Sequence, residues 1–100
     1  MEEHIYAADM HQHENKEISG FYLAQEKELR EGKGGSFIRI KIRDRSGYAT
    51  ANVWKDAAKT SELFDAGDVV YIKAQVVNYK GQTQLSIQNL RFADKSEFDM

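Results

Sequence analysis

Cysteine and proline are both absent from this 100-residue chain. Without cysteine there can be no disulfides or thiolate metal sites, and the composition suits a reducing compartment, so we expect a cytoplasmic protein. Without proline, strands can run long and unbroken. There is no run of about 18 apolar residues, and the N-terminus has neither the basic start nor the apolar core of a signal peptide. We therefore expect one domain that does not associate with membranes.

Groupings that carry catalysis are also missing. No Ser/His/Asp or Cys/His arrangement, carboxylate pair or metal cluster falls on elements expected to converge. His4, His11 and His13 lie near the N-terminus, but no further ligands follow at the spacing of a zinc site. The glycine-rich stretch 31–36 precedes a strand and lacks the spacing of a phosphate-binding loop. We expect no catalytic residue, metal site or cofactor.

Charge is distributed unevenly along the chain. Residues 1–17 carry a net charge of −4 and residues 94–100 carry −2, whereas residues 18–93 carry +4. A basic middle between acidic ends is compatible with a polyanionic partner despite the overall charge of −2. We expect a flexible acidic N-terminal segment over 1–17, a folded domain over 18–93 and a C-terminal tail over 94–100.

Two stretches, 36–43 and 48–55, alternate apolar and polar residues as strands with one buried face do. Between them, Asp44 can accept a hydrogen bond from the backbone ahead of it and Gly47 tolerates positive φ, so the pair predicts a tight turn. The residues predicted to face the core are Ile38, Ile40, Ile42, Ala49, Ala51 and Val53.

Three more strands and one helix complete the predicted elements. A first strand covers 18–29, with Gly20 suggesting a bulge or bend, and a flexible loop follows over 31–36. A short helix covers 57–65, with Asp56 as its N-cap and Gly67 at its C-terminal end. The last two strands cover 69–77 and 83–92, joined by a turn at 78–82.

Three strands, a short helix and two more strands predict an all-β, five-stranded Greek-key barrel with the helix between strands three and four. This order is that of the oligonucleotide/oligosaccharide-binding (OB) fold. Periodicity alone also permits small barrels of the SH3 kind, and the position of the helix favours OB.

Short motifs resemble the OB domains of the tRNA-anticodon-binding type. They lie at the openings of strands two and four, at the first turn and at the end of strand three. The residues are Gly35-Ser36-Phe37-Ile38, Asp44-Arg45-Ser46-Gly47, Val53-Trp54 and Gly67-Asp68-Val69-Val70.

Residues 18–92 resemble most the N-terminal OB domain of the YhaM-type 3′→5′ exoribonucleases. The resemblance rests on Phe21-Tyr22-Leu23, Trp54-Lys55-Asp56 (with one residue inserted) and the hairpin from Tyr79-x-Gly81 to Gln84-Leu85. In that family a separate HD-type metal domain performs the cleavage. This chain has no His-Asp pair, and it has Ala74 where the family tends to have Gly. The resemblance therefore implies an RNA-binding module that does not itself cut RNA.

An OB barrel binds its ligand on strands two and three and on the loops that flank them. Rings in such a face stack on bases, cations contact phosphates and amides or hydroxyls bond base edges. The predicted binding residues are Lys33, Phe37, Arg39, Lys41, Tyr48, Thr50, Asn52, Trp54, Tyr79, Lys80 and Gln84.

Structural roles compete with these assignments. Trp54 can instead close the barrel beneath the helix, and Phe37 and Tyr48 can be cross-strand packing partners. Arg39, Lys41 and Arg43 can be solvated charges that discourage aggregation. Tyr22 and Tyr71 are expected to be structural.

The function predicted from sequence is therefore binding of single-stranded nucleic acid, with RNA favoured over DNA. The domain would hold substrate for an exoribonuclease, or be a free-standing relative, with a catalytic domain or another protein as further partner. The alternative is a protein–protein interaction module, because OB barrels also bind proteins.

Overall fold

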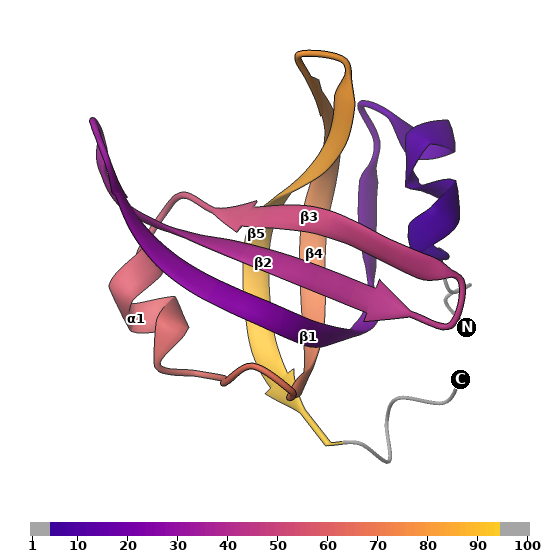
Figure 1. The fold of residues 1–100 in the computed structure, drawn as a ribbon. Coiled ribbons are helices and arrows are strands. Elements are labelled where there is room, and N and C mark those ends of the chain that lie inside the picture. The colour runs from indigo at the N-terminus through magenta and orange to yellow at the C-terminus, as the bar shows by residue number, and fades with distance from the viewer. Residues whose placement is uncertain (1–4, 95–100) are drawn as a thin grey trace.

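The computed structural model describes residues 5–94 (Figure 1). Five strands, one 3₁₀ helix and one α-helix make up this part of the chain. In chain order they are η1 (Ala7–His13), β1 (Glu17–Gly32), β2 (Gly35–Asp44), β3 (Gly47–Val53), α1 (Ala57–Ser61), β4 (Val69–Tyr79) and β5 (Gln82–Ala93).

The strands close into a barrel in the order β1-β2-β3-β5-β4. All neighbours are antiparallel except β3 and β5, which pair in parallel. The long strand β1 joins the two ends of this order, because its first half pairs with β4 and its second half pairs with β2. This topology, with α1 between β3 and β4, confirms the predicted OB fold.

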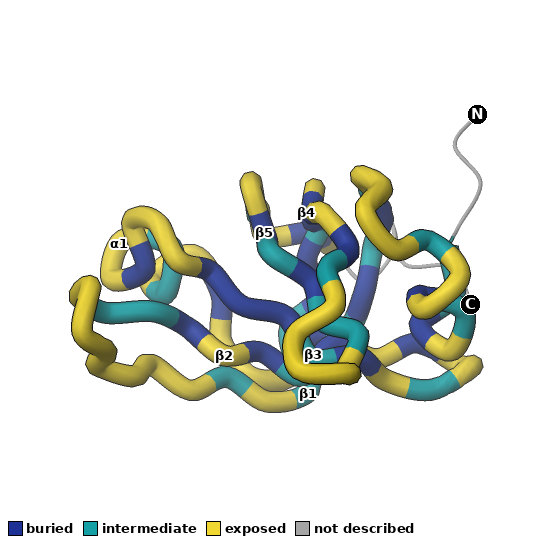
Figure 2. Tube along the Cα trace, turned by 90° about the horizontal axis from the view of Figure 1, so that it is seen from above, coloured by how far each residue is buried: buried dark blue, intermediate teal, exposed yellow. Residues whose placement is uncertain are grey.

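The core lies inside the barrel and follows the predicted alternation. The isoleucines of β2 are fully buried, and Ala51 and Val53 of β3 are buried opposite them. Figure 2 shows buried stretches along the strands and exposed hairpin tips. The further inward residues of β4 and β5 are Val70, Ile72, Ala74, Val76, Leu85 and Ile87.

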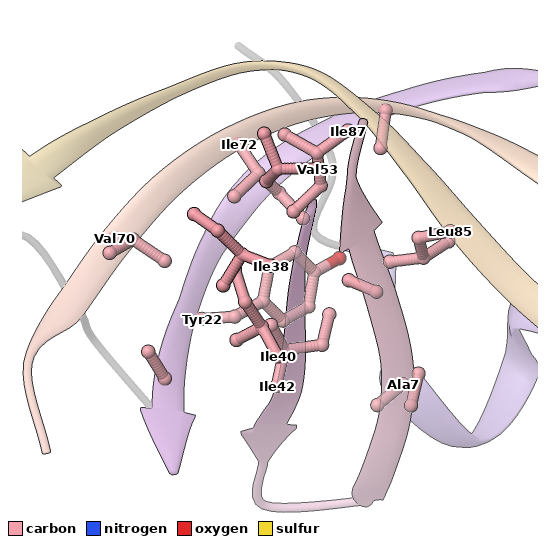
Figure 3. Packing of buried hydrophobic residues seen from close by; sticks show 14 of the residues in the cluster. Ala7, Tyr22, Ile38, Ile40, Ile42, Val53, Val70, Ile72, Leu85 and Ile87 are labelled. Carbon is pink, nitrogen blue, oxygen red and sulfur yellow. The ribbon is translucent and has the colours of Figure 1, made fainter. Parts of the chain in front are cut away.

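The largest fully buried side chain is Tyr22 of β1, whose ring lies among the isoleucines of β2 (Figure 3). Its hydroxyl donates a hydrogen bond to the backbone carbonyl of Ile5, which ties the N-terminal segment to the core. Burial, and secondarily the charge of Asp44, raises the pKa of this phenol well above its usual range. Tyr22 is thus structural, as predicted.

The predicted irregularity at Gly20 is wrong. Gly20 pairs regularly with β4, and the bulge lies at Gln25, where β1 passes from one neighbour to the other. A Cβ at Gly20 would lie 3.2 Å from the ring of Tyr22. Glycine is therefore suited to this position because the tyrosine ring fills the space that a side chain would need.

The N-terminal segment differs from the flexible chain expected over 1–17. Residues 7–13 form η1, in which Ala7 and Met10 are buried against the barrel. In a 3₁₀ helix, side chains three residues apart lie on one face, so this pair forms a small apolar stripe. His11 is exposed and His13 is half-buried, while His4 and residues 95–100 of the predicted tail lie outside the described residues.

Asp44 anchors this segment to the β2–β3 turn. Its Oδ1 accepts hydrogen bonds from the backbone N–H and the hydroxyl of Ser46, at 2.8 and 2.6 Å. Its Oδ2 accepts one from the N–H of Ala7, at 2.9 Å. The backbone bond within the turn was predicted, but the bond to Ala7 depends on a contact 37 residues away in sequence.

Two predicted boundaries are wrong. The flexible loop over 31–36 is a two-residue turn, because β1 and β2 pair as far as Gly32 and Gly35. The helix ends at Ser61, because the chain turns there so that Phe64 enters the core.

Of the two predicted caps of this helix, the N-cap position is confirmed but makes no side-chain bond, and the C-terminal cap at Gly67 is wrong. Asp56 occupies the N-cap position, but it has left-handed backbone angles and its side chain makes no capping hydrogen bond. Gly67 has a φ of +97°, yet it belongs to the turn before β4, where its N–H donates to the carbonyl of Ala24 at 2.8 Å.

Lys27 supplies the support that these caps do not give. Its Nζ donates to the carbonyls of Ser61 and Phe64 at 2.8 and 2.7 Å, and it lies 4.9 Å from the centre of the Phe64 ring. Carbonyls at a helix C-terminus lack partners within the helix, so a cation there stabilises it. A residue of β1 thus fixes the end of α1.

Tyr22 predicts a loss of stability in alkali. Above a pH of about 10, phenols of the unfolded chain ionise, whereas Tyr22 in the folded barrel stays neutral because its pKa is raised. The contribution of neutral Tyr22 to the free energy of unfolding is complete below that pH and declines as the pH rises further. Urea unfolding from pH 7 to 11 should show this decline, and Tyr22→Phe should flatten it. Parallel curves for the two proteins would contradict the assignment.

Lys27→Met should lower the free energy of unfolding by ~1–3 kcal/mol, because it leaves two carbonyls without their charged donor. Chemical denaturation measures the change. Lys59→Met, at an exposed position on α1, is the matched control and should change stability by less than about 0.5 kcal/mol. Equal effects of the two substitutions would contradict the role of Lys27.

Candidate nucleic-acid interface

The outer face of β2 and β3 collects most of the predicted binding residues. Because Ile38 and Ile40 point into the barrel, Phe37, Arg39 and Lys41 point outward. Opposite them on β3 lie Asn52, which pairs with Arg39, and Thr50, which pairs with Lys41.

A groove of about 450 Å³ opens on this face between β2, β3 and the β4–β5 hairpin. In Figure 1 that hairpin projects beyond the barrel next to β3. The groove combines rings, a cation and amides with apolar walls. Its lining residues are Phe37, Arg39, Asn52, Trp54, Val77, Tyr79, Gln84, Leu85 and Ser86.

Phe37 and Trp54 form a platform at the edge of the groove. Their ring centres are 4.8 Å apart and their planes are inclined by 30°. Trp54 is 57% exposed, so it does not close the barrel beneath the helix. Phe37 does pack across the strands, as the structural alternative proposed, but its partner is itself an exposed ring.

The β4–β5 hairpin brings Tyr79 to the groove from the opposite side. Lys80 and Gly81 both have positive φ, as in the two-residue hairpin turns that match strand twist. Tyr79 is 57% exposed, and the Nζ of Lys80 lies 5.4 Å from its ring centre. A ring and a cation thus stand together above the groove.

A second hollow of about 230 Å³ lies beside the first and shares Arg39 with it. Tyr48 and Lys41 line it, with the lysine Nζ 4.3 Å from the ring centre, and Thr50 lies between them and the main groove. Tyr48 therefore pairs with a cation and does not pack on Phe37. Arg43 pairs with Tyr48 across the hairpin but does not line either hollow.

A third hollow of about 290 Å³ surrounds the β1–β2 turn and contains Lys33. Phe37 and Trp54 line it and the main groove alike. The three hollows therefore form one track from Tyr48 to Lys33, and all eleven predicted residues lie along it or on the hairpin above it.

Sequence reasoning missed two kinds of residue. Glu26 and Glu28 of β1 border the second hollow, so its rim is partly acidic. The Nε of Arg30 lies 3.0 Å from Oε1 of Glu28 and forms an ion pair with it. Val77 and Ser86 line the main groove. Both side chains line the outer face of the barrel, and only the pairing of β5 with β3 brings them to the groove.

Asn52 faces outward as predicted, but it is only 3% exposed because it forms the floor of the groove. Its Nδ2 donates to Oε1 of Gln84 on β5 at 3.1 Å. Its Oδ1 is buried and has no hydrogen-bond partner among the described residues. The floor of the groove thus consists of amide groups, which can form hydrogen bonds with the polar edges of bases.

No group of three or more metal-binding side chains occurs within residues 5–94. In the same part of the chain, no helix is long and apolar enough to span a membrane.

The rings of the platform should contribute little to stability because Trp54 is 57% exposed and Phe37 is only half-buried. Phe37→Ala and Trp54→Ala should each lower the free energy of unfolding by at most ~1.5 kcal/mol. Ile40→Ala in the core, the comparison variant, should cost ~2–5 kcal/mol. Urea unfolding followed by circular dichroism measures all three, and platform variants as damaging as the core variant would show that the rings belong to the core.

Solved structures with similar folds include tRNA synthetases and single-stranded DNA binding proteins. Asparaginyl-tRNA synthetase from Pyrococcus horikoshii superposes with a TM-score of 0.76 over 94% of this chain, at 20% identity. The single-stranded DNA binding protein from Thermus aquaticus gives 0.65 over 78% of this chain and 40% of its own, at 17% identity. The second OB-fold domain of replication protein A from Methanococcus maripaludis gives 0.56 over 82% of this chain and 86% of its own, at 16% identity.

These identities are low, so the superpositions establish the fold alone. The chain spans 20–24% of the length of the tRNA synthetases that it matches. The family model of the OB-fold nucleic acid binding domain matches residues 21–93, which include every strand that lines the groove. The chain therefore belongs to the family of OB-fold nucleic acid binding domains.

Proposed function

We propose that this domain binds single-stranded nucleic acid along the track on β2 and β3, with RNA preferred over DNA. The observation that carries the proposal is the platform of half-buried Phe37 and exposed Trp54 at the edge of a groove floored by amides. The part of these rings that faces solvent is apolar, and a stacked base covers it.

Stacking on such rings contributes ~1–3 kcal/mol per base and tolerates every base, because each has a π-face. Tyr79 and Tyr48 extend the set of rings along the track. Bases in a duplex are already stacked on each other, so these rings suit a single strand.

Cations accompany the rings at each step of the track. Arg39 lines both the main groove and the second hollow, and within residues 5–94 no carboxylate lies within 4 Å of its guanidinium. Lys33 and Lys80 stand at the two flanking turns. Phosphates that contact these side chains release bound counterions, so affinity should fall as salt rises.

The preference for RNA and the link to RNA degradation rest on the resemblance to YhaM-type exoribonucleases. The hairpin that carries Tyr79 and Gln84 is part of that resemblance, and both residues line the groove. The similar structures are named for tRNA charging and for single-stranded DNA binding, so both nucleic acids are ligands to test. In this proposal the domain holds RNA for a nuclease domain or acts as a free-standing relative.

Fluorescence of the single tryptophan tests the proposal directly. Short single-stranded RNA and DNA should quench Trp54 saturably, more tightly for RNA, and the affinity should weaken as NaCl rises from 50 to 200 mM. Trp54→Ala, measured by anisotropy of a labelled oligonucleotide, should weaken binding about 5- to 150-fold. Phe92→Ala removes a ring that is 50% exposed outside the track and should bind like the wild type.

Several outcomes would contradict the proposal. Folded protein that binds no oligonucleotide at low salt would overturn it and favour a protein partner. Binding that Trp54→Ala leaves unchanged would place the site elsewhere on the barrel. Tighter binding of DNA than of RNA would overturn the stated preference alone.

A further inference from the structure

Two amide side chains meet at the floor of the groove. Asn52 on β3 and Gln84 on β5 are neighbours because these strands pair in parallel, with Thr50 opposite Gln84 and Asn52 opposite Ser86. Asn52 donates through Nδ2 to the Oε1 of Gln84 at 3.1 Å. One polar atom of each amide remains outside this bond, namely Oδ1 of Asn52 and Nε2 of Gln84.

Nothing else in residues 5–94 fixes which way this pair is oriented. The Oδ1 of Asn52 is buried without a partner, and the bond to Gln84 is the only side-chain hydrogen bond of either amide in this part of the chain. An unpaired buried acceptor is costly, so a donor supplied by a ligand would be favourable there. The oxygen is enclosed, so a base edge must displace groove side chains to reach it.

The oxygen and nitrogen of an amide are nearly equal in size, so a half-turn exchanges acceptor and donor with little change in packing. If both amides turn together, Gln84 donates to Asn52 and the bond between them is kept. The free position at Asn52 then changes from an acceptor to a donor, and the free position at Gln84 changes from a donor to an acceptor.

We propose that Asn52 and Gln84 form an invertible amide pair that lets the groove accept bases of either hydrogen-bonding polarity. This inference rests on the proposed binding of single-stranded nucleic acid. In the orientation observed, the pair offers an acceptor at Asn52 and a donor at Gln84, which matches the amino group and ring nitrogen of adenine or cytosine. The inverted pair matches the carbonyl and ring N–H of uracil or guanine.

The pair therefore predicts a base-tolerant site in which each base is nevertheless hydrogen-bonded. Stacking on Phe37 and Trp54 is indifferent to base identity as well. A domain that handles RNA of many sequences requires both properties.

Carboxylate substitutions test the inversion, because a carboxylate only accepts hydrogen bonds. Gln84→Glu forces Asn52 to donate to it and leaves acceptors in both remaining positions. Asn52→Asp forces Gln84 to donate instead, and it also leaves acceptors in both remaining positions. The affinities of labelled rA8, rC8 and rU8 are compared by anisotropy. Gln88→Glu is the control, because Gln88 is exposed on β5 outside the groove and its substitution adds the same charge.

The wild type and the Gln88→Glu control should bind the three octamers within about threefold of one another. Each groove variant should bind all three octamers about tenfold more weakly than the Gln88→Glu control, because every base then sets one of its own acceptors against an acceptor of the pair: the ring nitrogen of adenine or cytosine, or the carbonyl of uracil. Comparison with this control, which adds the same charge, removes the general effect of added charge on phosphate binding.

Wild-type protein that discriminates tenfold or more among the octamers would overturn the inference. So would groove variants that bind the octamers as tightly as the Gln88→Glu control does, and two variants guard against one that fails to fold. In both of these cases the proposed function survives. If wild-type protein bound none of the octamers, the proposed function itself would fail and the inference with it.

Discussion

The short parallel pairing between β3 and β5 is the constraint on which the rest of this structure depends. It closes the barrel through three residue pairs only, from Thr50 with Gln84 to Asn52 with Ser86. Leu85 and Ala51 at its centre are fully buried, so the core holds the two strands in register. The same register places the outward residues of β5 beside those of β3. One interaction therefore closes the core and forms the groove.

The two ends of the β2–β3 hairpin are held by segments from elsewhere in the chain. At one end, Asp44 bonds the N–H of Ala7, and η1 adds Ala7 and Met10 to the core. At the other end, α1 follows β3 and adds Ala57 to the core, and the turn after the helix adds Phe64. Lys27 donates hydrogen bonds to the carbonyls of Ser61 and Phe64. The face between these ends presents the rings of Phe37 and Trp54 already side by side, which lowers the ordering cost of stacking a base.

The rings on the binding face contrast with those on the other side of the barrel. Phe21, Tyr71 and Arg91 pack on one another across β1, β4 and β5, with the phenyl and phenol ring centres 4.8 Å apart. Both sets combine aromatic and cationic side chains in a similar way. Only the set that contains Phe37 and Trp54 borders the large groove, so the hollow between the strands distinguishes the candidate site.

The sequence by itself determined the barrel, because alternation of apolar residues is a local property of each strand. The isoleucines of β2, together with Val70 and Val76 of β4, identify the core face, and the helix between strands three and four indicates the topology. The outward positions of Phe37, Arg39 and Asn52 follow from the same alternation. Family motifs such as the hairpin at Tyr79 added the expectation of nucleic-acid binding.

Only the tertiary structure decided the features that depend on residues distant in sequence. Trp54 is exposed because Ala57 of α1 and Phe64, which follows the helix, fill this end of the barrel, and the local pattern does not reveal this. Lys27 and Asp44 bond backbone groups 34 to 37 residues away. The bonds of Ala7 to Asp44 and of Ala8 to Ser46 hold η1. The meeting of Asn52 with Gln84, 32 residues apart, exists only because closing the barrel sets β3 beside β5.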